Sequence, residues 1–197
     1  EVVLHADHVV SHANSVMGLV ESFVGVVPAG GGCKETLYRW TENLGDNHKA
    51  AWKSFMNIGL GRLANSPTEA NALSMRRAGD VFHMNRDYML NVALNSLDKT
   101  KKANARKPLA LSGSEHFKEM LEWLTTNHEK SMLTPHDVTV GTEIARIVSG
   151  GDCPSGAIFT EQDILDAERF SFISLAQTSE TQARIVAMLD NGITLRN

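Results

Sequence analysis

The sequence predicts a mainly α-helical protein with a small β-containing segment at its N-terminus. Short apolar runs rich in Val and Gly fill only the first forty residues, where glycines and the loop Pro28–Gly32 interrupt them. Helix-start signals recur from Asp46 onward, and two later segments carry apolar side chains at helical spacing. We therefore expect strands between Glu1 and about Pro28, and a bundle of helices in the remainder of the chain.

The clearest helix start is the segment Ser66–Glu69, which reads Ser-Pro-Thr-Glu. Serine is a preferred N-cap, proline fits the first helical position, and a glutamate at the third helical position can bond back to the cap. With Gly79 as a C-cap, this pattern predicts a helix over Pro67–Ala78. Similar signals predict helix starts at Asp46, Asn85, Ser114, Thr134, Thr160 and Ser179.

Two of the expected helices carry apolar residues at the i, i+3, i+4, i+7 positions that share one helix face. We expect each set to form a buried face of the core. The two sets are Phe117, Met120, Leu121 and Leu124, and Leu90, Ala93, Leu94 and Leu97.

A basic run between these two helices marks the expected domain boundary. Such a run is typical of a solvated linker, although binding of an anion is the alternative. We place one domain at residues 1–104 and a helical C-terminal extension at residues 105–197. The run consists of Lys99, Lys101, Lys102, Arg106 and Lys107, and it ends at Pro108.

The composition excludes several classes of protein. With 19 Lys and Arg against 23 Asp and Glu, the formal net charge is -4, so we expect no broad cationic surface for nucleic acid. Glycines and polar residues interrupt the apolar stretches too often for a membrane span. The two cysteines, Cys33 and Cys153, lie far apart and outside metal-ligand spacing, which indicates free thiols and a cytoplasmic location.

Several short motifs lack the context that their chemistry needs. Gly59–Ala64 matches a dinucleotide-binding pattern, but no strand is expected before it, so we interpret it as close packing at a helix end. Pro28–Lys34 lacks the Gly-Lys-Ser/Thr ending of a phosphate loop, and His128–Met132 lacks the second histidine of a zinc-protease helix. A change from helix to strand would scatter His5, His8 and His12, so we expect no metal site.

One pattern in the first forty residues carries chemistry. Glu1 and Glu21 lie twenty positions apart, Asp7 lies between them, and the Gly-x-x-Pro-x-x-Gly-Gly loop Gly25–Gly32 follows. This pattern resembles the enoyl-CoA hydratase (crotonase) superfamily, in which two glutamates at this spacing precede such a loop. The resemblance implies the C-terminal part of a crotonase-like ββα spiral, followed by a helical extension.

Hydration of a 2-enoyl thioester needs one group to activate water and another to deliver a proton to the α-carbon. The resemblance implies that Glu1 orients and activates the water, that Glu21 supplies the proton, and that Gly18 and Leu19 contact the acyl-CoA substrate. The thioester enolate also needs two backbone N–H donors. In this family they come from residues before the first glutamate, so we expect the isolated chain to be inactive without the N-terminal part of the same protein.

Three C-terminal segments, Asp166–Arg169, Ser179–Arg184 and Leu195–Asn197, extend the resemblance. They are similar to the C-terminal extension of large bacterial fatty-acid oxidation proteins that fuse a 3-hydroxyacyl-CoA dehydrogenase to a crotonase-like domain. This implies NAD for an upstream dehydrogenase, no cofactor or metal in this part, and a homo-oligomer. We also expect Asn197 to be the natural C-terminus and Glu1 an artificial N-terminus.

Two other functions stay open. An enoyl-CoA isomerase needs only one acid/base carboxylate, so a pair of glutamates favours hydration. Alternatively, the helical region from Ser66 to Asn197 is a docking or oligomerisation module without its own catalysis. The repeated capped, amphipathic helices, and the lack of any catalytic grouping beyond Lys34, favour this second alternative.

Overall fold

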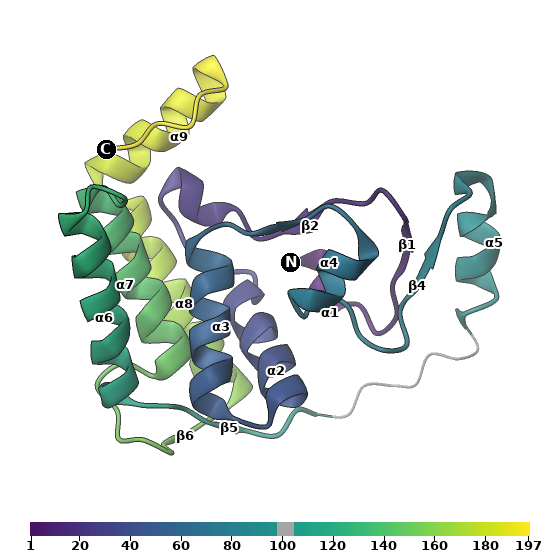
Figure 1. The fold of residues 1–197 in the computed structure, drawn as a ribbon, viewed down its shortest axis with the longest axis horizontal. Helices are drawn as coiled ribbons and strands as arrows, with labels where there is room; N and C mark the ends of the chain where they lie inside the picture. The colour runs from purple at the N-terminus through teal and green to yellow at the C-terminus, as the bar shows by residue number, and fades with distance from the viewer. Residues whose placement is uncertain (98–104) are drawn as a thin grey trace.

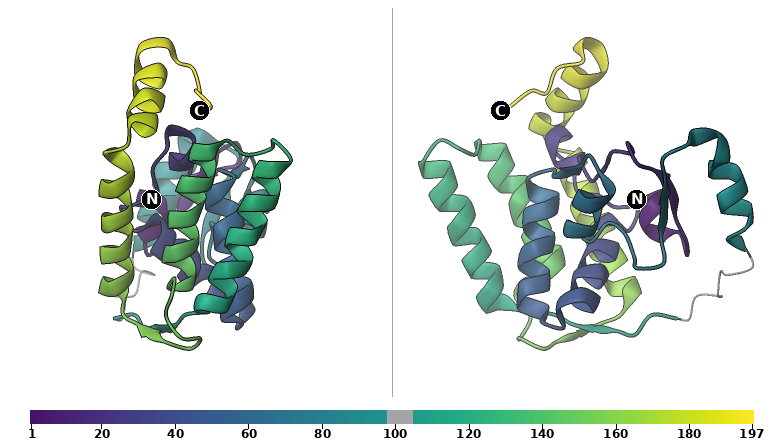
Figure 2. Two further views of the ribbon diagram at one scale, coloured as in Figure 1. Left: turned by 90° about the vertical axis from the view of Figure 1, so that its left-hand side faces the viewer. Right: turned by 45° about the vertical axis from the view of Figure 1, so that its right-hand side comes forward.

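The computed structural model describes residues 1–97 and 105–197, and Figure 1 shows a body of helices with a looser N-terminal part beside it. Helix α7 packs against both α3 and α6, α2 packs against α3, and α8 completes the body. Figure 2 shows that the last helix, α9 (Ser179–Asn191), continues beyond one end of this body. The body consists of α2 (Gly32–Leu44), α3 (Asn47–Gly59), α6 (Ser114–Glu129), α7 (Pro135–Ser149) and α8 (Glu161–Ala176).

The strands are short and pair only in twos within the described residues. β1 (Val10–His12) is parallel to β4 (Val81–His83), β2 (Met17–Gly18) is antiparallel to β3 (Leu63–Ala64), and β5 (Leu109–Ala110) is antiparallel to β6 (Ile158–Phe159). The remaining elements are α1 (Val2–His5), the 3-10 helix η1 (Glu21–Val24), α4 (Pro67–Ala72), the 3-10 helix η2 (Arg86–Tyr88) and α5 (Met89–Leu94).

The prediction of a mainly helical chain is confirmed, but the expectation that strands end near Pro28 is wrong. Backbone N–H and C=O groups of an extended segment need partners. Here the partners of β1 and β2 come from much later in the chain, at residues 81–83 and 63–64. That this chain forms the C-terminal part of a crotonase-like spiral stays a prediction.

Most predicted helix starts are confirmed by their caps. The Asp46 carboxylate accepts the Lys49 N–H at 3.0 Å, and Thr134 and Thr160 each form a reciprocal capping box. Asn85 caps η2 through the Asp87 N–H. Ser114 and Ser179 are the first helical residues of α6 and α9, but the N-caps lie one residue earlier, at Gly113 and Thr178.

The helix predicted over Pro67–Ala78 is wrong in its length, because α4 ends at Ala72. Ser74 has a positive φ of 55°, which a continuing helix does not allow. Side chains from the neighbouring helices bind this turn: Asn57 Nδ2 donates to the Leu73 carbonyl and Asn43 Nδ2 donates to Ser74 Oγ. Tertiary hydrogen bonds therefore end the helix before its expected C-cap.

One of the two predicted apolar faces is buried and the other is not. On α6, Phe117, Met120 and Leu124 are at most 4% exposed, as predicted. On α5, Leu90 is 70% exposed and Leu94 is 54% exposed, and Figure 1 shows this short helix far from the helical body. Spacing predicts which residues share a face, but not whether another element covers it.

The main core contains residues from both sides of the expected boundary between residues 104 and 105. Phe55 of α3 packs edge-on against Trp123 of α6, with ring centres 5.7 Å apart. Ile144 of α7 is fully buried in the same cluster. The division into two domains stays a prediction. No helix in the described ranges is both long and apolar enough to cross a membrane.

Candidate functional site

The first residue, Glu1, is held against the glycine loop. Its Oε1 accepts hydrogen bonds from the N–H groups of Gly30 (2.8 Å) and Gly32 (3.0 Å). A Cβ at position 30 would lie 2.9 Å from Glu1 Oε2, and a Cβ at position 32 would lie 2.6 Å from the Cβ of Pro28. Glycine is therefore needed for the loop to approach the carboxylate this closely.

Glu21 is the first residue of η1 and is half-buried. Its Oε2 is buried and has no hydrogen-bond partner among the described residues. Burial raises the pKa of Glu21, a hydrogen bond to its own backbone opposes this, and the negative charge of Glu1 raises the pKa further. Burial and the charge of Glu1 thus shift Glu21 toward its neutral form relative to a free glutamate, which is the direction that a proton donor needs.

A cavity of about 150 Å³ lies beside Glu1. The structure thereby brings together three of the four predicted site residues, Glu1, Gly18 and Leu19, while Glu21 does not line the cavity. Pockets that hold whole small molecules usually exceed roughly 300 Å³, so this one admits only a small group. Its lining consists of Glu1, Val3, Leu4, Val16, Met17, Gly18, Leu19 and Met75.

A third carboxyl group, Glu168 of α8, binds the same loop and was not predicted as a site residue. It is fully buried and accepts hydrogen bonds from the N–H groups of Gly31 (2.8 Å) and Lys34 (2.6 Å). Glu1 and Glu168 thus each accept hydrogen bonds from two N–H groups of the loop and the first turn of α2. The positive end of the α2 dipole also favours a negative charge here.

Burial of Glu168 outweighs these donors and shifts the carboxyl group toward its neutral form relative to a free glutamate. Burial raises its pKa from 4.5 to about 7; the two backbone donors oppose this rise, and the charge of Glu1 adds to it. The sequence does hold a signal for such a residue. Glu168 lies on the same face of α8 as the buried residues Ile164 and Leu175. A glutamate therefore occupies a position on the buried face of the helix, where apolar side chains are usual.

A second buried carboxylate, Glu35 on α2, organises a cluster of cations. It is 2% exposed and lies 2.8 Å from Lys34 Nζ, 2.8 Å from Arg106 Nη2 and 3.6 Å from Arg77 Nη2. Burial alone would raise the pKa of Glu35, but Lys34 and Arg106 lower it below its usual value. Lys34 also pairs with Glu161 of α8 at 2.7 Å. The cluster therefore ties α2 to α8 and to the segment before β5.

The prediction that the basic run is a solvated linker is wrong at one residue, Arg106, which belongs to this cluster. Arg106 is not part of a solvated linker, because it pairs with Glu35 and its guanidinium lies 4.7 Å from the centre of the Tyr38 ring. Lys107 is exposed, as expected for a linker. Lys99, Lys101 and Lys102 lie outside the described residues.

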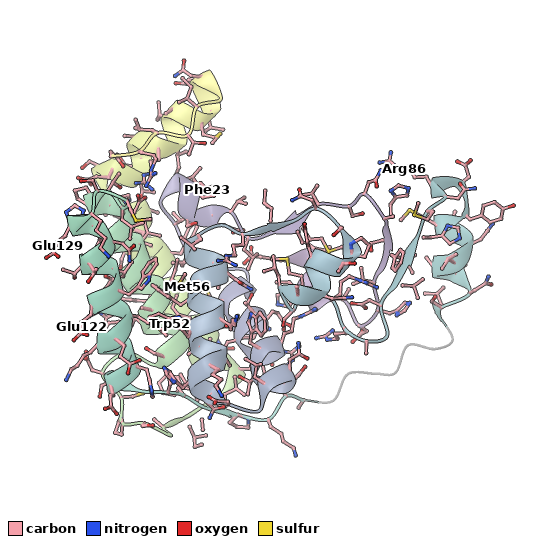
Figure 3. All side chains as sticks on the ribbon, in the orientation of Figure 1. Phe23, Trp52, Met56, Arg86, Glu122 and Glu129 are labelled. Atoms are coloured by element: carbon pink, nitrogen blue, oxygen red, sulfur yellow. The ribbon has the colours of Figure 1, made fainter. Side chains whose placement is uncertain are left out.

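A larger cavity of about 480 Å³ lies between η1, α3, α6 and α7. Its walls are mainly apolar and include Phe23, Met56 and Trp123; Figure 3 shows Phe23 at η1 and Met56 beside Trp52 on α3, whereas Glu122 and Glu129 lie on α6. At one end, Arg184 and Arg196 bind the two oxygens of Asp137 at 2.9 and 2.7 Å. The lining of this cavity includes Ser22, the residue directly after Glu21 on η1.

The other sequence motifs lie outside this site. Gly59 ends α3 with open space where a Cβ would lie, so the close packing expected at this helix end occurs at Gly61, which has a φ of 52° and the Phe23 ring at its Cβ position. His5 is on α1 and His12 on β1, so the three early histidines do not share one element. Cys33 is a buried free thiol, and Cys153 is a half-buried one.

The described residues do not fit NAD. A dinucleotide site needs a glycine-rich turn between a parallel strand and a helix, with free N–H groups for the pyrophosphate. Gly59–Ala64 follows a helix. The N–H groups of the loop before α2 are engaged by Glu1 and Glu168.

Comparison with known proteins gives one informative similarity. No family model matches the chain. The chain is 28% identical over 201 residues to a probable 3-hydroxyacyl-CoA dehydrogenase of Bacillus subtilis (strain 168). The match covers 100% of this chain and 26% of that protein. The chain thus spans about a quarter of the length of the relative and is similar to one part of it.

Proposed function

We propose that this chain is part of a crotonase-superfamily enzyme that hydrates 2-enoyl-CoA to 3-hydroxyacyl-CoA in fatty-acid β-oxidation. The observation that carries the proposal is the pair of carboxyl groups: Glu1 fixed by the glycine loop, and Glu21 with a pKa raised by burial and by the charge of Glu1. Residues 1–104 would belong to the hydratase domain, and residues 105–197 would form its helical extension.

In the proposed reaction, Glu1 takes a proton from a water molecule whose oxygen forms a bond to the β-carbon of the substrate. The electrons of the double bond move toward the thioester carbonyl, and neutral Glu21 gives its proton to the α-carbon. Water is thereby added across the double bond with no oxidant or reductant. The two carboxyl groups then exchange one proton through solvent to restore the starting state.

The enolate formed in this reaction needs preorganised N–H donors. Four such groups in the glycine loop and the first turn of α2 are already bound to Glu1 and Glu168, so they are not free for this task. We propose that the donors come from a part of the protein upstream of Glu1, and that the isolated chain is inactive. The β1–β4 ladder, which pairs with no third strand among the described residues, is a suitable place for that part to pair.

We also propose that the parent protein carries an NAD-dependent 3-hydroxyacyl-CoA dehydrogenase. The name of the Bacillus relative supports this. A hydratase would make the 3-hydroxyacyl-CoA that such a dehydrogenase oxidises. NAD would bind outside this chain, whose described residues do not fit it. The apolar cavity that begins beside η1 is the part of the described structure best suited to an acyl chain.

A docking or oligomerisation role is a second candidate, and it is compatible with the first. Exposed apolar side chains on α5 and α8 favour it: Leu90 is 70% exposed, Phe170 is 68% exposed and Ile173 is 49% exposed. Faces of this kind commonly mark association surfaces. We therefore propose that the parent protein is a homo-oligomer.

The test uses protein made from the complete coding sequence that contains this chain, with crotonyl-CoA and longer 2-enoyl-CoA esters as substrates. Glu1→Gln and Glu21→Gln should each lower the hydration rate by roughly 100-fold or more, as expected for loss of an acid/base group. Glu122→Gln, at an exposed position on α6, is the matched control.

Unchanged hydration in both glutamine variants would contradict the proposal. Conversion of a 3-enoyl-CoA to a 2-enoyl-CoA without hydration would identify an isomerase instead. A complete protein that associates but transforms neither substrate would favour the docking module.

A further inference from the structure

Two imidazoles and one carboxylate meet outside the site described above, at the start of α3 and in the first turns of α6. Both helices begin at the same end of the helical body (Figure 1). The rings of His48 and His116 are stacked, with centres 3.5 Å apart and planes inclined by 30°. His48 Nε2 lies 3.2 Å from Glu119 Oε2. One ligand atom from each of the three residues lies within 4.8 Å of the others.

We propose that His48, His116 and Glu119 bind a zinc ion that links α3 to α6. Zinc binds histidine nitrogen and carboxylate oxygen at about 2.0 to 2.2 Å in a tetrahedral arrangement, which places its ligand atoms roughly 3.3 Å apart. Side-chain rotation closes the gap from the present spacing, because the three residues are half-buried or exposed. Water would take the fourth position.

The surroundings prepare His116 for this role. Its Nδ1 lies 3.0 Å from the Ser112 carbonyl oxygen, which can only accept, so the proton sits on Nδ1 and Nε2 keeps a free lone pair. A second hydrogen bond of this kind fixes the tautomer and orientation of metal-binding histidines. Phe117 and Met120 beside it are buried in the core, which holds this turn of α6 in place.

The backbone of His48 is also fixed, because it lies two residues after Asp46, the N-cap of α3. The two imidazoles decide which metal fits. Calcium and magnesium prefer oxygen ligands, whereas imidazole suits zinc, nickel and copper. Sequence spacing gave no sign of this site, because His48 and His116 are 68 positions apart (116 minus 48) and only the packing of α3 against α6 joins them.

The test measures zinc bound at equilibrium by protein from the complete coding sequence, stripped of metal with a chelator and free of any polyhistidine tag. Wild-type protein should bind one equivalent of zinc more than His48→Ala or His116→Ala does. Each of these variants should weaken that one site by tenfold or more. His128→Ala is the control, since His128 is an exposed histidine at the other end of α6.

Glu119→Gln provides a variant at an exposed position that should fold normally. It should weaken zinc binding less than loss of either histidine does. X-ray absorption at the zinc edge should show two imidazole ligands in the wild type. Zinc binding that is unchanged in the His48 and His116 variants, or no stoichiometric zinc in the wild type, would overturn the proposal.

Discussion

Replacement of Glu168 by glutamine tests the buried carboxyl group that holds the glycine loop. Glutamine has nearly the same shape but cannot ionise. The amide NH2 group of the glutamine would replace one of the two carboxyl oxygens. This donor would then face the backbone N–H of Gly31 or Lys34, which needs an acceptor. Loss of one buried hydrogen bond of this kind costs about 1 to 3 kcal/mol at every pH.

The pH dependence gives the sharper result. The pKa of Glu168 is about 7 in the folded chain, against 4.5 for a free glutamate, so the folded state holds the proton more tightly than the unfolded state between these values. The free energy of unfolding must then fall as the pH rises through this window. At 1.36 kcal/mol per pKa unit, the loss attributable to Glu168 is about 3 kcal/mol between pH 4.5 and pH 8.

The assay is urea unfolding of the 197-residue chain, followed by circular dichroism, at several pH values across this window. Glu168→Gln should be less stable than the wild type at low pH and should lose this disadvantage, or exceed the wild type, near pH 8. Other titrating groups act equally in both proteins, and Glu122→Gln should keep the wild-type pH dependence. A constant difference between Glu168→Gln and the wild type would refute the raised pKa.

Three further changes probe the loop and the charge clusters, each measured as a free energy of unfolding. Gly32→Ala should cost about 1 to 3 kcal/mol through overpacking, because the new Cβ would lie 2.6 Å from the Cβ of Pro28. Gly59→Ala is the control and should be neutral, because nothing lies within 4 Å of a Cβ at that position. Equal losses of stability in the two variants would contradict the close packing at Gly32. Glu35→Gln should cost about 3 to 5 kcal/mol, because it removes the partner of Lys34 and Arg106; a cost under about 1 kcal/mol would show that the cluster is solvated. Burial opposes ionisation of Asp137, but hydrogen bonds from the Thr134 backbone, Arg196 and Arg184 lower its pKa from 3.8 to about 2; this contributes about 2 kcal/mol above pH 4 that is lost as the pH falls toward 2. Asp137→Asn should therefore flatten the acid side of the stability curve, and an unchanged curve would contradict the lowered pKa.

Sequence signals predicted the fold well where the structure depends only on residues that are close together in the chain. Asp46, Thr134 and Thr160 cap helices as their side chains predict, because a cap needs only residues within one turn. The end of α4 was missed, since Asn43 and Asn57 reach it from other helices. The exposure of the apolar face of α5 was not predicted, because the spacing of apolar residues does not indicate which helix faces pack against another element.

The candidate site was predictable in part. The spacing of Glu1 and Glu21 and the glycine loop predict a site in this region, and the loop indeed binds Glu1. Glu168 was missed, although its place on the apolar face of α8 is visible in the sequence. Its contacts to Gly31 and Lys34 join residues more than 130 positions apart, and no local pattern reports such a contact.

The most direct measurement of the proposed chemistry is the fate of solvent deuterium during turnover. Protein from the complete coding sequence is incubated with crotonyl-CoA in D2O, and the product is analysed by mass spectrometry and NMR. Wild-type protein should form 3-hydroxybutyryl-CoA with one deuterium at the α-carbon, and Glu21→Gln should lose this incorporation together with hydration, because the donor of the α-proton is gone. Undiminished incorporation at the α-carbon in Glu21→Gln would contradict the assignment of Glu21 as that donor.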